Sequence, residues 1–274
     1  MKTTNTATRT VLAAVLILLA FVGQLSAQPA PTFVSATFFG GSGDQGGQPG
    51  QGRGTDIAIR SGAIYLSGQI PGANRQGLFL GYTSPPSPSP VWSRSFDYRT
   101  TVMGIAATND AVYGAGSNYD LTTDNVGDKE DKSLLAKFSL DGSNGPGAGG
   151  SQWVATPNFF SYTGGETFQA VTTAVEGTNT YIYAAGAGQP CSWLAFVIAK
   201  FDASGHLLAA ATESTLGIQF NQCFVPSNNF SEAKAITVFN GMIYSAGYST
   251  YEDGLARPVL GKHGSALNLM WRQR

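Results

Sequence analysis

The chain has 274 residues, of which 35 are glycine and only 12% are charged, and its formal net charge is -1. Surface helices carry many charged side chains and few glycines, so this composition excludes a helical bundle. The 42% share of hydrophobic residues excludes a disordered chain. The near-neutral charge excludes a basic surface for nucleic acid, so a glycine-rich, mostly β protein remains.

The first 27 residues have the pattern of a secretory signal peptide. Lys2 and Arg9 precede an apolar run over 11–22, and small residues ending at Ala27 are typical of a cleavage site. At about 1.5 Å per residue this run would reach only about 18 Å into a roughly 30 Å hydrocarbon core, which disfavours a membrane anchor. We therefore expect a mature chain of residues 28–274, without a membrane span, that is secreted, periplasmic or at the cell surface.

Four segments of the mature chain are short apolar stretches that end in Tyr-x-x-Gly. Another apolar stretch precedes each of them across a short turn, and one such turn, Asn240-Gly241, is among the strongest hairpin signals. Two further apolar stretches follow each hairpin. The sequence therefore predicts four units of four strands, which lie approximately at 55–96, 102–160, 168–217 and 232–274.

Repeated units of four antiparallel strands are typical of a β-propeller, in which each unit forms one blade around a central channel. The first strand of a blade is crowded near the axis, so it needs small side chains. The residues that meet this need are Gly104, Ala106, Ala170, Ala233 and Ala235. The large aromatic residues expected to fill the space between blades include Trp92, Trp153, Phe201 and Trp271. We predict an all-β propeller of about four blades.

The segment 195–205, AFVIAKFDASG, resembles the third strand and turn of the bacterial seven-bladed β-propeller repeat family, the SBBP repeats. The segment 134–142, LLAKFSLDG, is similar to the same part of the repeat. The segment 36–44, ATFFGGSGD, resembles the stretch that joins one blade to the next. The resemblance implies a secreted or surface-associated propeller, often part of a larger protein, and it brings no catalytic motif.

One more strand is predicted over 33–39, ahead of the first unit. It matches the fourth strand of a blade, and the last unit already supplies its own fourth strand. We therefore favour an incomplete ring, the N-terminal part of a larger propeller, over a closed four-bladed ring with one extra edge strand. An open ring leaves free sheet edges, which predicts self-association.

The chain has two cysteines, Cys191 and Cys223. Both lie in the exported part, in loop-like sequence next to prolines, where an oxidising compartment permits a bond between them. We expect a disulfide in preference to two separate buried thiols.

The most acidic insertion, residues 120–132, contains candidate calcium ligands in Asp124, Asp128 and Asp131. Their spacing does not match an EF-hand loop, and Lys129 and Lys132 offset part of the charge. The pattern favours a solvated acidic loop, and we expect no other cofactor.

Candidate catalytic carboxylates lie near the starts of the predicted innermost strands, at Asp56, Glu166 and Glu232. Their convergence at one mouth of the channel would suit a polysaccharide lyase or hydrolase. Isolated carboxylates at strand ends more often cap turns, and neither His206 nor His263 has a recognisable catalytic partner in the sequence.

Several tyrosines fall near strand ends or in loops, where flat amphipathic rings can stack on sugars or dock a protein. They include Tyr82, Tyr119, Tyr248 and Tyr251. The sequence thus favours an exported, non-catalytic structural or interaction module that binds a surface protein or a glycan. The alternative is a secreted propeller enzyme that uses the carboxylates named above.

Overall fold

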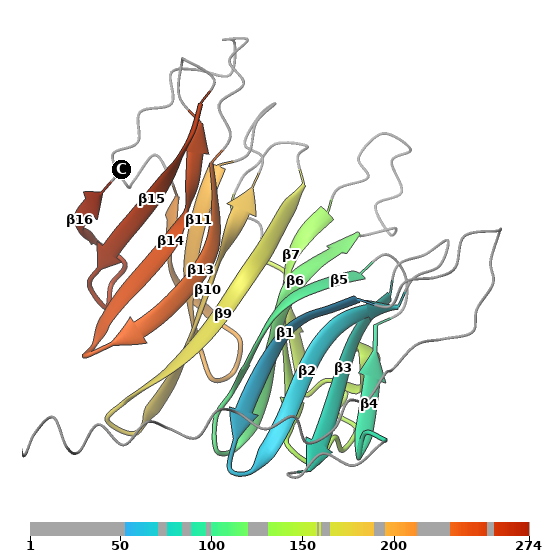
Figure 1. The fold of residues 1–274 in the computed structure, drawn as a ribbon. Helices are drawn as coiled ribbons and strands as arrows, with labels where there is room; N and C mark the ends of the chain where they lie inside the picture. The colour runs from blue at the N-terminus through green and yellow to red at the C-terminus, as the bar shows by residue number, and fades with distance from the viewer. Residues whose placement is uncertain are drawn as a thin grey trace, which may run out of the picture. The chain divides into compact units, whose positions relative to one another are not determined.

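The computed structural model describes residues 53–70, 76–83, 89–96, 100–119, 131–157, 159, 165–188, 195–212, 231–250 and 255–273. These residues all belong to one compact unit, Thr37–Arg274. They form four four-stranded antiparallel sheets (Figure 1). The predicted signal peptide and the predicted strand 33–39 lie outside the described residues. Among the residues that the structure describes, no helix has the length and apolar character needed to cross a membrane.

Each sheet consists of four strands that are consecutive in the chain and lie in chain order. Sheet 1 contains β1 (Arg53–Arg60), β2 (Ala63–Ile70), β3 (Gln76–Thr83) and β4 (Trp92–Ser95). Sheet 2 contains β5 (Thr100–Ala107), β6 (Ala111–Tyr119), β7 (Asp131–Ser139) and β8 (Trp153–Ala155), with the short 3-10 turn η1 (Ala148–Gly150) before β8. Sheet 3 contains β9 (Glu166–Glu176), β10 (Asn179–Gly188), β11 (Ala195–Asp202) and β12 (Leu207–Thr212). Sheet 4 contains β13 (Ser231–Phe239), β14 (Met242–Thr250), β15 (Ala256–His263) and β16 (Leu269–Gln273). The predicted all-β class and the four-stranded units are confirmed.

The first two strands of each sheet form a hairpin, as the Tyr-x-x-Gly pattern predicts. In sheet 4 the turn residues Asn240 and Gly241 have φ of 49° and 71°. In sheet 1 Ser61 and Gly62 have φ of 50° and 76°. Positive φ at both central residues is the requirement of a type I′ turn, whose twist matches that of the flanking strands.

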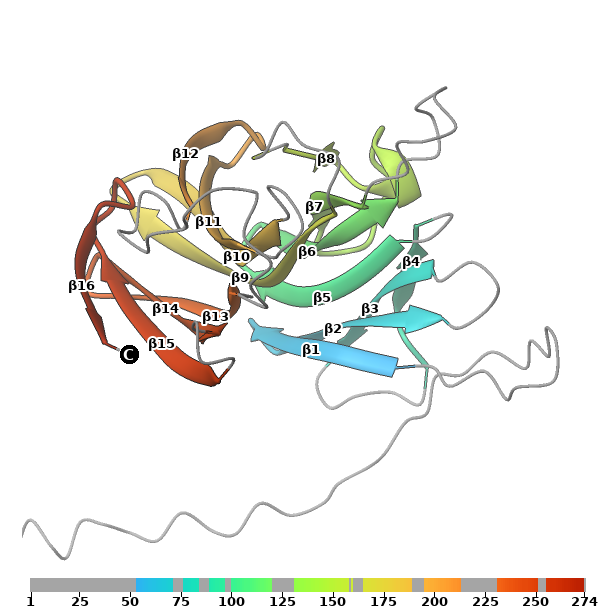
Figure 2. The same ribbon diagram turned by 90° about the horizontal axis from the view of Figure 1, so that it is seen from above.

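The four sheets fan out like the blades of a propeller (Figure 2). Their first strands lie toward the middle, and their fourth strands lie at the periphery. The first strand of each later sheet packs on the sheet before it: β5 on β1 to β3, β9 on β5 to β7, and β13 on β9 to β11. No comparable packing joins sheet 4 to sheet 1 within the described residues.

The glycine of the Tyr-x-x-Gly motif faces a β-bulge in the first strand of its sheet. The pairing register shifts beside all four motif glycines, Gly68, Gly116, Gly186 and Gly247. The bulge pushes a carbonyl toward the motif glycine, so a Cβ at Gly116, Gly186 or Gly247 would overlap that oxygen. In sheets 2 to 4 the motif therefore ends in glycine because no side chain fits opposite the bulge.

The small residues predicted near the axis include a position where two backbones meet. A Cβ on Gly104 in β5 would lie 3.0 Å from the Cα of Ala170 in β9. Glycine and alanine here allow the first strands of sheets 2 and 3 to approach closely. The prediction of a crowded inner strand is confirmed at this pair.

The described residues form four hydrophobic core clusters, of which three lie between two neighbouring sheets and the fourth lies on sheet 1 alone. Phe79 of sheet 1 packs against Phe138 of sheet 2, with ring centroids 4.6 Å apart. Tyr113 of sheet 2 lies in one cluster with Phe201 of sheet 3, and Tyr183 of sheet 3 lies in another with Ile236 of sheet 4. Each large side chain buried in this way contributes roughly 1.5–3 kcal/mol, so the sheets stabilise one another through their faces.

Candidate functional site

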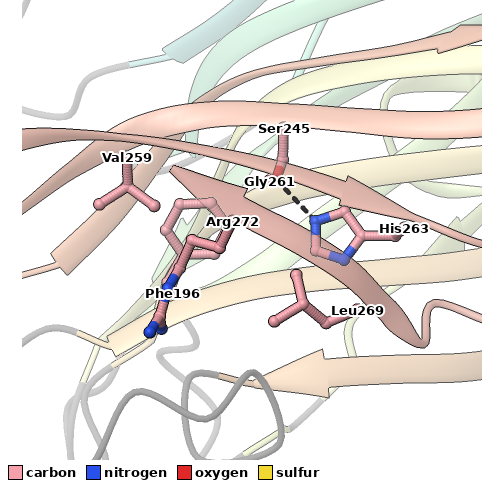
Figure 3. A pocket seen from close by; sticks show the side chains of 7 residues that line it. All are labelled: Phe196, Ser245, Val259, Gly261, His263, Leu269 and Arg272. Atoms are coloured by element: carbon pink, nitrogen blue, oxygen red, sulfur yellow. Dashed lines mark hydrogen bonds between the residues drawn. The ribbon is translucent and has the colours of Figure 1, made fainter. Parts of the chain in front are cut away.

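A small pocket between sheets 3 and 4 contains a buried Ser–His pair (Figure 3). The Nε2 of His263 lies 2.9 Å from the Oγ of Ser245, and His263 is 1% exposed. Burial lowers the pKa of the His263 ring to about 4, so the ring is neutral at pH 7. The other residues that line the pocket are Phe196, Val259, Gly261, Leu269 and Arg272.

In sheets 2 and 3 a phenylalanine of the core stands at the position that His263 has in sheet 4. Phe138 and Phe201 occupy the position of His263, each paired with the residue before a motif tyrosine. The sequence gives no sign of this partner, because Ser245 lies 18 positions away in the chain and comes next to His263 only across the sheet. The pocket has a volume of about 10 Å³, which is room for one water molecule. The pair is therefore a polar element of the core and has no space for a substrate.

The three candidate carboxylates are each held by hydrogen bonds within the fold. Asp56 accepts bonds from the backbone N of Ile57 at 2.8 Å and, across the sheets, from the N of Ile105 at 2.9 Å. Glu166 accepts a bond from the N of Phe159 at 2.9 Å. These contacts give both side chains a structural role in joining strands and segments.

Glu232 is buried in the first strand of sheet 4 between two partners. Its Oε2 accepts a bond from the hydroxyl of Tyr248 at 3.0 Å and lies 2.7 Å from the Nζ of Lys234. Burial, and then the bond and charge of Glu232, raise the pKa of Tyr248. Within the described ranges, no group of three or more His, Cys, Asp or Glu side chains is arranged to hold a metal ion.

The other predicted site residues are placed as follows. Tyr82 lies in β3 and is buried, so its ring faces the interior of the protein. Tyr119 ends β6 and Asp131 begins β7, but their side chains lie outside the description. Asp124, Asp128, Cys191, Cys223 and Tyr251 lie outside the described residues.

A row of three paired residues recurs on one face of every sheet, and we call it the cross-sheet row. It begins at the motif tyrosine, continues to its partner in the third strand, and ends at that residue's partner in the fourth strand. The rows are Tyr65–Gly81–Trp92, Tyr113–Lys137–Trp153, Tyr183–Lys200–Ala209 and Tyr244–Lys262–Trp271.

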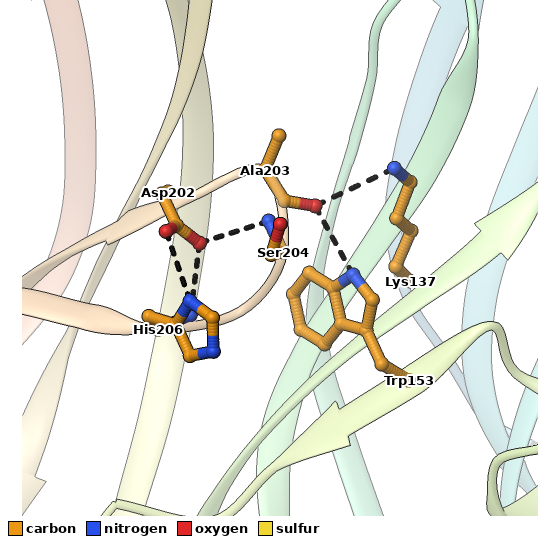
Figure 4. Close-up of polar contacts among 6 residues, drawn as sticks. All are labelled: Lys137, Trp153, Asp202, Ala203, Ser204 and His206. Carbon is orange, nitrogen blue, oxygen red and sulfur yellow. Dashed lines mark hydrogen bonds and ion pairs between the residues drawn. The ribbon is translucent and has the colours of Figure 1, made fainter.

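In sheet 2 the cross-sheet row binds the next sheet through one carbonyl (Figure 4). The Nε1 of Trp153 donates to the oxygen of Ala203 at 3.1 Å, and the Nζ of Lys137 donates to the same oxygen at 3.4 Å. Ala203 lies in the turn between β11 and β12 of sheet 3. The Nζ of Lys137 also lies 5.9 Å from the ring centroid of Tyr113, within the range of a cation–π contact.

The same bond recurs at the other two junctions between sheets. Trp92 donates through Nε1 to the oxygen of Leu140 in sheet 2 at 2.9 Å. Lys200 donates through Nζ to the oxygen of Ser265 in sheet 4 at 3.1 Å. Sheet 1 lacks the lysine and sheet 3 lacks the tryptophan, yet each keeps one donor. The acceptor is always in the turn between the third and fourth strands of the following sheet.

In the turn that accepts this bond, the residue with a positive φ is matched in size to the side chain that packs on it from the preceding sheet. A Cβ on Gly205 would lie 2.8 Å from the Trp153 ring, and a Cβ on Gly142 would overlap the Trp92 ring. Sheet 3 has Ala209 in place of tryptophan, and the turn of sheet 4 accordingly carries Leu267, which is buried at a φ of 63°. The larger turn residue fills the space that the missing indole leaves.

The turn of sheet 3 is held by its own aspartate, as Figure 4 also shows. Asp202 accepts bonds from the backbone N of Ser204 at 2.8 Å and of His206 at 2.9 Å, and its carboxylate lies 3.1 Å from the His206 ring. Burial opposes ionisation of Asp202, but the bonds from His206 and Ser204 together outweigh it and lower the pKa of Asp202. His206 is an exposed turn residue, as predicted.

A double-mutant cycle tests whether Trp153 and Lys137 share one acceptor. Trp153→Phe and Lys137→Met each leave the Ala203 oxygen one donor, so each should lower the free energy of unfolding by about 1 kcal/mol. The double variant removes both donors and should lose about 1 kcal/mol more than the sum. Urea denaturation of the four proteins measures this coupling, and strictly additive losses would contradict the shared contact.

Sheet 4 carries a complete cross-sheet row that no following sheet covers in the described structure. Trp271, which is expected to fill a space between blades, is 41% exposed, so no described sheet covers it. Sheet 4 differs most from the other sheets in the exposure of the residue that pairs with the third position of the Tyr-x-x-Gly motif. This residue is 0% exposed in sheets 1 to 3, as Phe79, Leu135 and Ile198, but Leu260 in sheet 4 is 40% exposed.

Sheet 1 exposes apolar side chains on the face that, in sheets 2 to 4, packs against the preceding sheet. Ile57 and Ile59 of β1 are 55% and 68% exposed. The residues that correspond to Ile57 in sheets 2 to 4 are Ile105, Val171 and Ile236, and the preceding sheet buries all three. Farther out on the same face, Leu78 and Leu80 are already buried. On this face of sheet 1, exposed apolar side chains thus remain only in β1, whereas sheet 4 at the other end of the series exposes Leu260 and Trp271.

No family model and no curated protein matches this chain. Among solved structures, an α-L-arabinofuranosidase from Clostridium thermocellum aligns over 80% of this chain and 71% of its own, with 10% identity and a TM-score of 0.39. An acylaminoacyl peptidase in complex with a chloromethyl ketone aligns over 77% of this chain and 49% of its own, with 8% identity and a TM-score of 0.26. At these scores neither structure bears on the activity of this chain.

Proposed function

We propose that the chain is an exported β-propeller module that binds another protein through sheet 4. The surface concerned, which we call the sheet 4 face, consists of Tyr244, Leu260, Lys262 and Trp271. The observation that carries the proposal is the 40% exposure of Leu260, whose counterparts in the other three sheets are fully buried. An aliphatic and an indole side chain exposed together, with a lysine between them, are typical of a protein interface.

The chemistry of the sheet 4 face favours a protein partner over a glycan. Its lysine and tryptophan repeat the pair in sheet 2 that donates to one backbone carbonyl, at Ala203. Its aliphatic residue repeats a position that packs on a neighbouring sheet. Both features suit a polypeptide surface with an available carbonyl.

Export and the propeller class rest on the sequence and on the arrangement of the sheets. The signal-peptide pattern ending at Ala27 supports export, and the resemblance of segment 195–205 to the SBBP repeat supports a propeller within a larger assembly. The alternative of a lyase or hydrolase would use Asp56, Glu166 and Glu232. Hydrogen bonds already engage these carboxylates in joining parts of the fold.

Site-specific photocrosslinking on the exported protein in its native host tests the proposal. A photoreactive amino acid in place of Leu260 should form a covalent adduct with a protein, whereas the same group in place of Val175 should not. Val175 is a suitable control because it is an apolar residue of β9 that is 67% exposed and lies outside the sheet 4 face. The adduct should disappear when Trp271→Ser is added.

Two results would overturn the proposed function. The first is the absence of a protein adduct at position 260 together with Trp271-dependent binding on a glycan array, which would assign the face to sugars. The second is hydrolysis or lyase cleavage of polysaccharides by the purified mature chain that Asp56→Asn abolishes.

A further inference from the structure

We infer that the partner of the sheet 4 face presents an antiparallel β-sheet, and that a turn of this sheet offers a backbone carbonyl and a glycine to Lys262 and Trp271. This inference rests on the proposed function and describes the surface that the partner brings to it. The three junctions inside the chain show what such a surface contains, because each of them joins a cross-sheet row to the sheet that follows.

The turn that receives a cross-sheet row is a four-residue β-turn at all three junctions. The backbone N of its fourth residue donates to the oxygen of its first residue, at Gly142–Ser139 (3.1 Å), Gly205–Asp202 (3.1 Å) and Leu267–Gly264 (2.9 Å). This bond leaves the carbonyl of the second residue available. The row donates to that second carbonyl each time, at Leu140, Ala203 and Ser265. A turn with an available second carbonyl is therefore the first feature expected of the partner.

The fourth residue of the turn has a positive φ and matches the end of the row in size. It is glycine where the row ends in tryptophan, because a Cβ at Gly142 or Gly205 would crowd the indole ring. It is Leu267 where the row ends in Ala209, and the two residues pack in one cluster. The row of sheet 4 ends in Trp271, so the turn that fits it ends in glycine.

The sheet that receives a row also places a β-branched side chain from each of its first two strands at the junction. These side chains are Ile105 and Val112 in sheet 2, Val171 and Ile182 in sheet 3, and Ile236 and Ile243 in sheet 4. They share their clusters with Phe79, Leu135 and Ile198, which are the counterparts of Leu260. A partner that covers Leu260 in the same way needs two such side chains on neighbouring strands beside the turn.

The row of sheet 4 already has the arrangement of the row that binds Ala203. Lys262 pairs with Tyr244 on one side and with Trp271 on the other, as Lys137 does with its own tyrosine and tryptophan. The Nζ of Lys262 lies 5.8 Å from the centroid of the Tyr244 ring, against 5.9 Å for Lys137 and its tyrosine. The two donors of sheet 4 are thus placed for one carbonyl before any sheet covers them.

The protein that a photoreactive residue at position 260 captures makes the inference testable. Mass spectrometry of the adduct locates the residue of the partner that the probe reaches. This residue should be β-branched and should lie in an antiparallel sheet in the crystal structure of the partner. The same sheet should contain a four-residue turn that ends in glycine.

Exchanging the sizes of the two contacting residues then tests the turn itself, by calorimetric titration of the purified partner with the mature chain. Trp271→Ala should raise the Kd by about 30-fold or more. Replacing the turn glycine of the partner by leucine should raise the Kd for the wild-type chain by about tenfold or more. The same leucine should lower the Kd for the Trp271→Ala variant, because Ala209 and Leu267 already form this combination between sheets 3 and 4. Val175→Ala is the matched control and should leave the Kd unchanged, and circular dichroism checks the folding of each variant.

The inference and the proposed function fail in different ways. A cross-linked surface made of helices would overturn the inference, as would a leucine that weakens binding to the wild-type chain and to Trp271→Ala equally. In both cases the adduct at position 260 still forms, so the proposed function stands. The absence of any protein adduct at position 260 overturns the proposed function and the inference with it.

Discussion

Replacing Gly186 by alanine is expected to lower the free energy of unfolding by about 3 kcal/mol or more. The new Cβ would overlap the carbonyl oxygen of Thr167 and would lie 2.7 Å from the Cα of Phe168. Both atoms belong to the backbone of the bulge in β9, so the overlap can be removed only if the bulge and its pairing register shift. Urea denaturation of the variant and the wild type measures the loss.

Gly54→Ala is the matched control for this prediction. Gly54 also lies in a first strand beside a bulge, but a Cβ there would meet no atom within 4 Å. Its substitution should change the free energy of unfolding by less than about 1 kcal/mol. Gly247→Ala, which meets the same type of carbonyl at Glu232, should behave like Gly186→Ala. Equal stability of Gly54→Ala and Gly186→Ala would show that the bulge does not select glycine.

The fold was predictable because its signals are local and repeated. Apolar stretches, turn residues such as Asn240-Gly241 and the motif glycines recur four times, and each recurrence reinforces the same four-stranded unit. The reason why the motif ends in glycine could not be predicted from the sequence. A bulge is a relation between two strands, so the sequence shows the glycine and not the carbonyl that excludes a side chain from it.

The candidate site depends on contacts between residues that are far apart in the chain, and these contacts could not be predicted from the sequence. Lys137 reaches the carbonyl of Ala203, 66 positions along the chain. Trp271 is exposed because no described sheet packs on it. The sequence around it does not show this, because it resembles the sequence around the more buried Trp92. One signal was available: a lysine stands at the same register in the third strands of sheets 2, 3 and 4, at Lys137, Lys200 and Lys262.

The stability of the chain should fall in acid because of His263. Its folded-state pKa is lowered to about 4 by burial, whereas an unfolded histidine has a pKa of about 6.5. Between these values the unfolded state binds more protons, so the His263 contribution is complete above pH 6.5 and is lost as the pH falls toward 4. The expected loss at pH 4 is about 3 kcal/mol relative to pH 7. Urea denaturation across this range measures it.

The double variant Ser245→Ala with His263→Phe isolates this effect from the carboxylates that also titrate in acid. It installs in sheet 4 the pair that sheet 3 already has, Ala184 with Phe201, so the core should remain filled. The buried histidine is gone, and the stability of the variant should therefore fall less between pH 7 and pH 4, by about 3 kcal/mol. Other titrating groups act equally in both proteins and cancel in the difference. Parallel stability curves, or a His263 ring that titrates near pH 6.5 by NMR in the folded wild type, would show that burial does not hold the ring neutral.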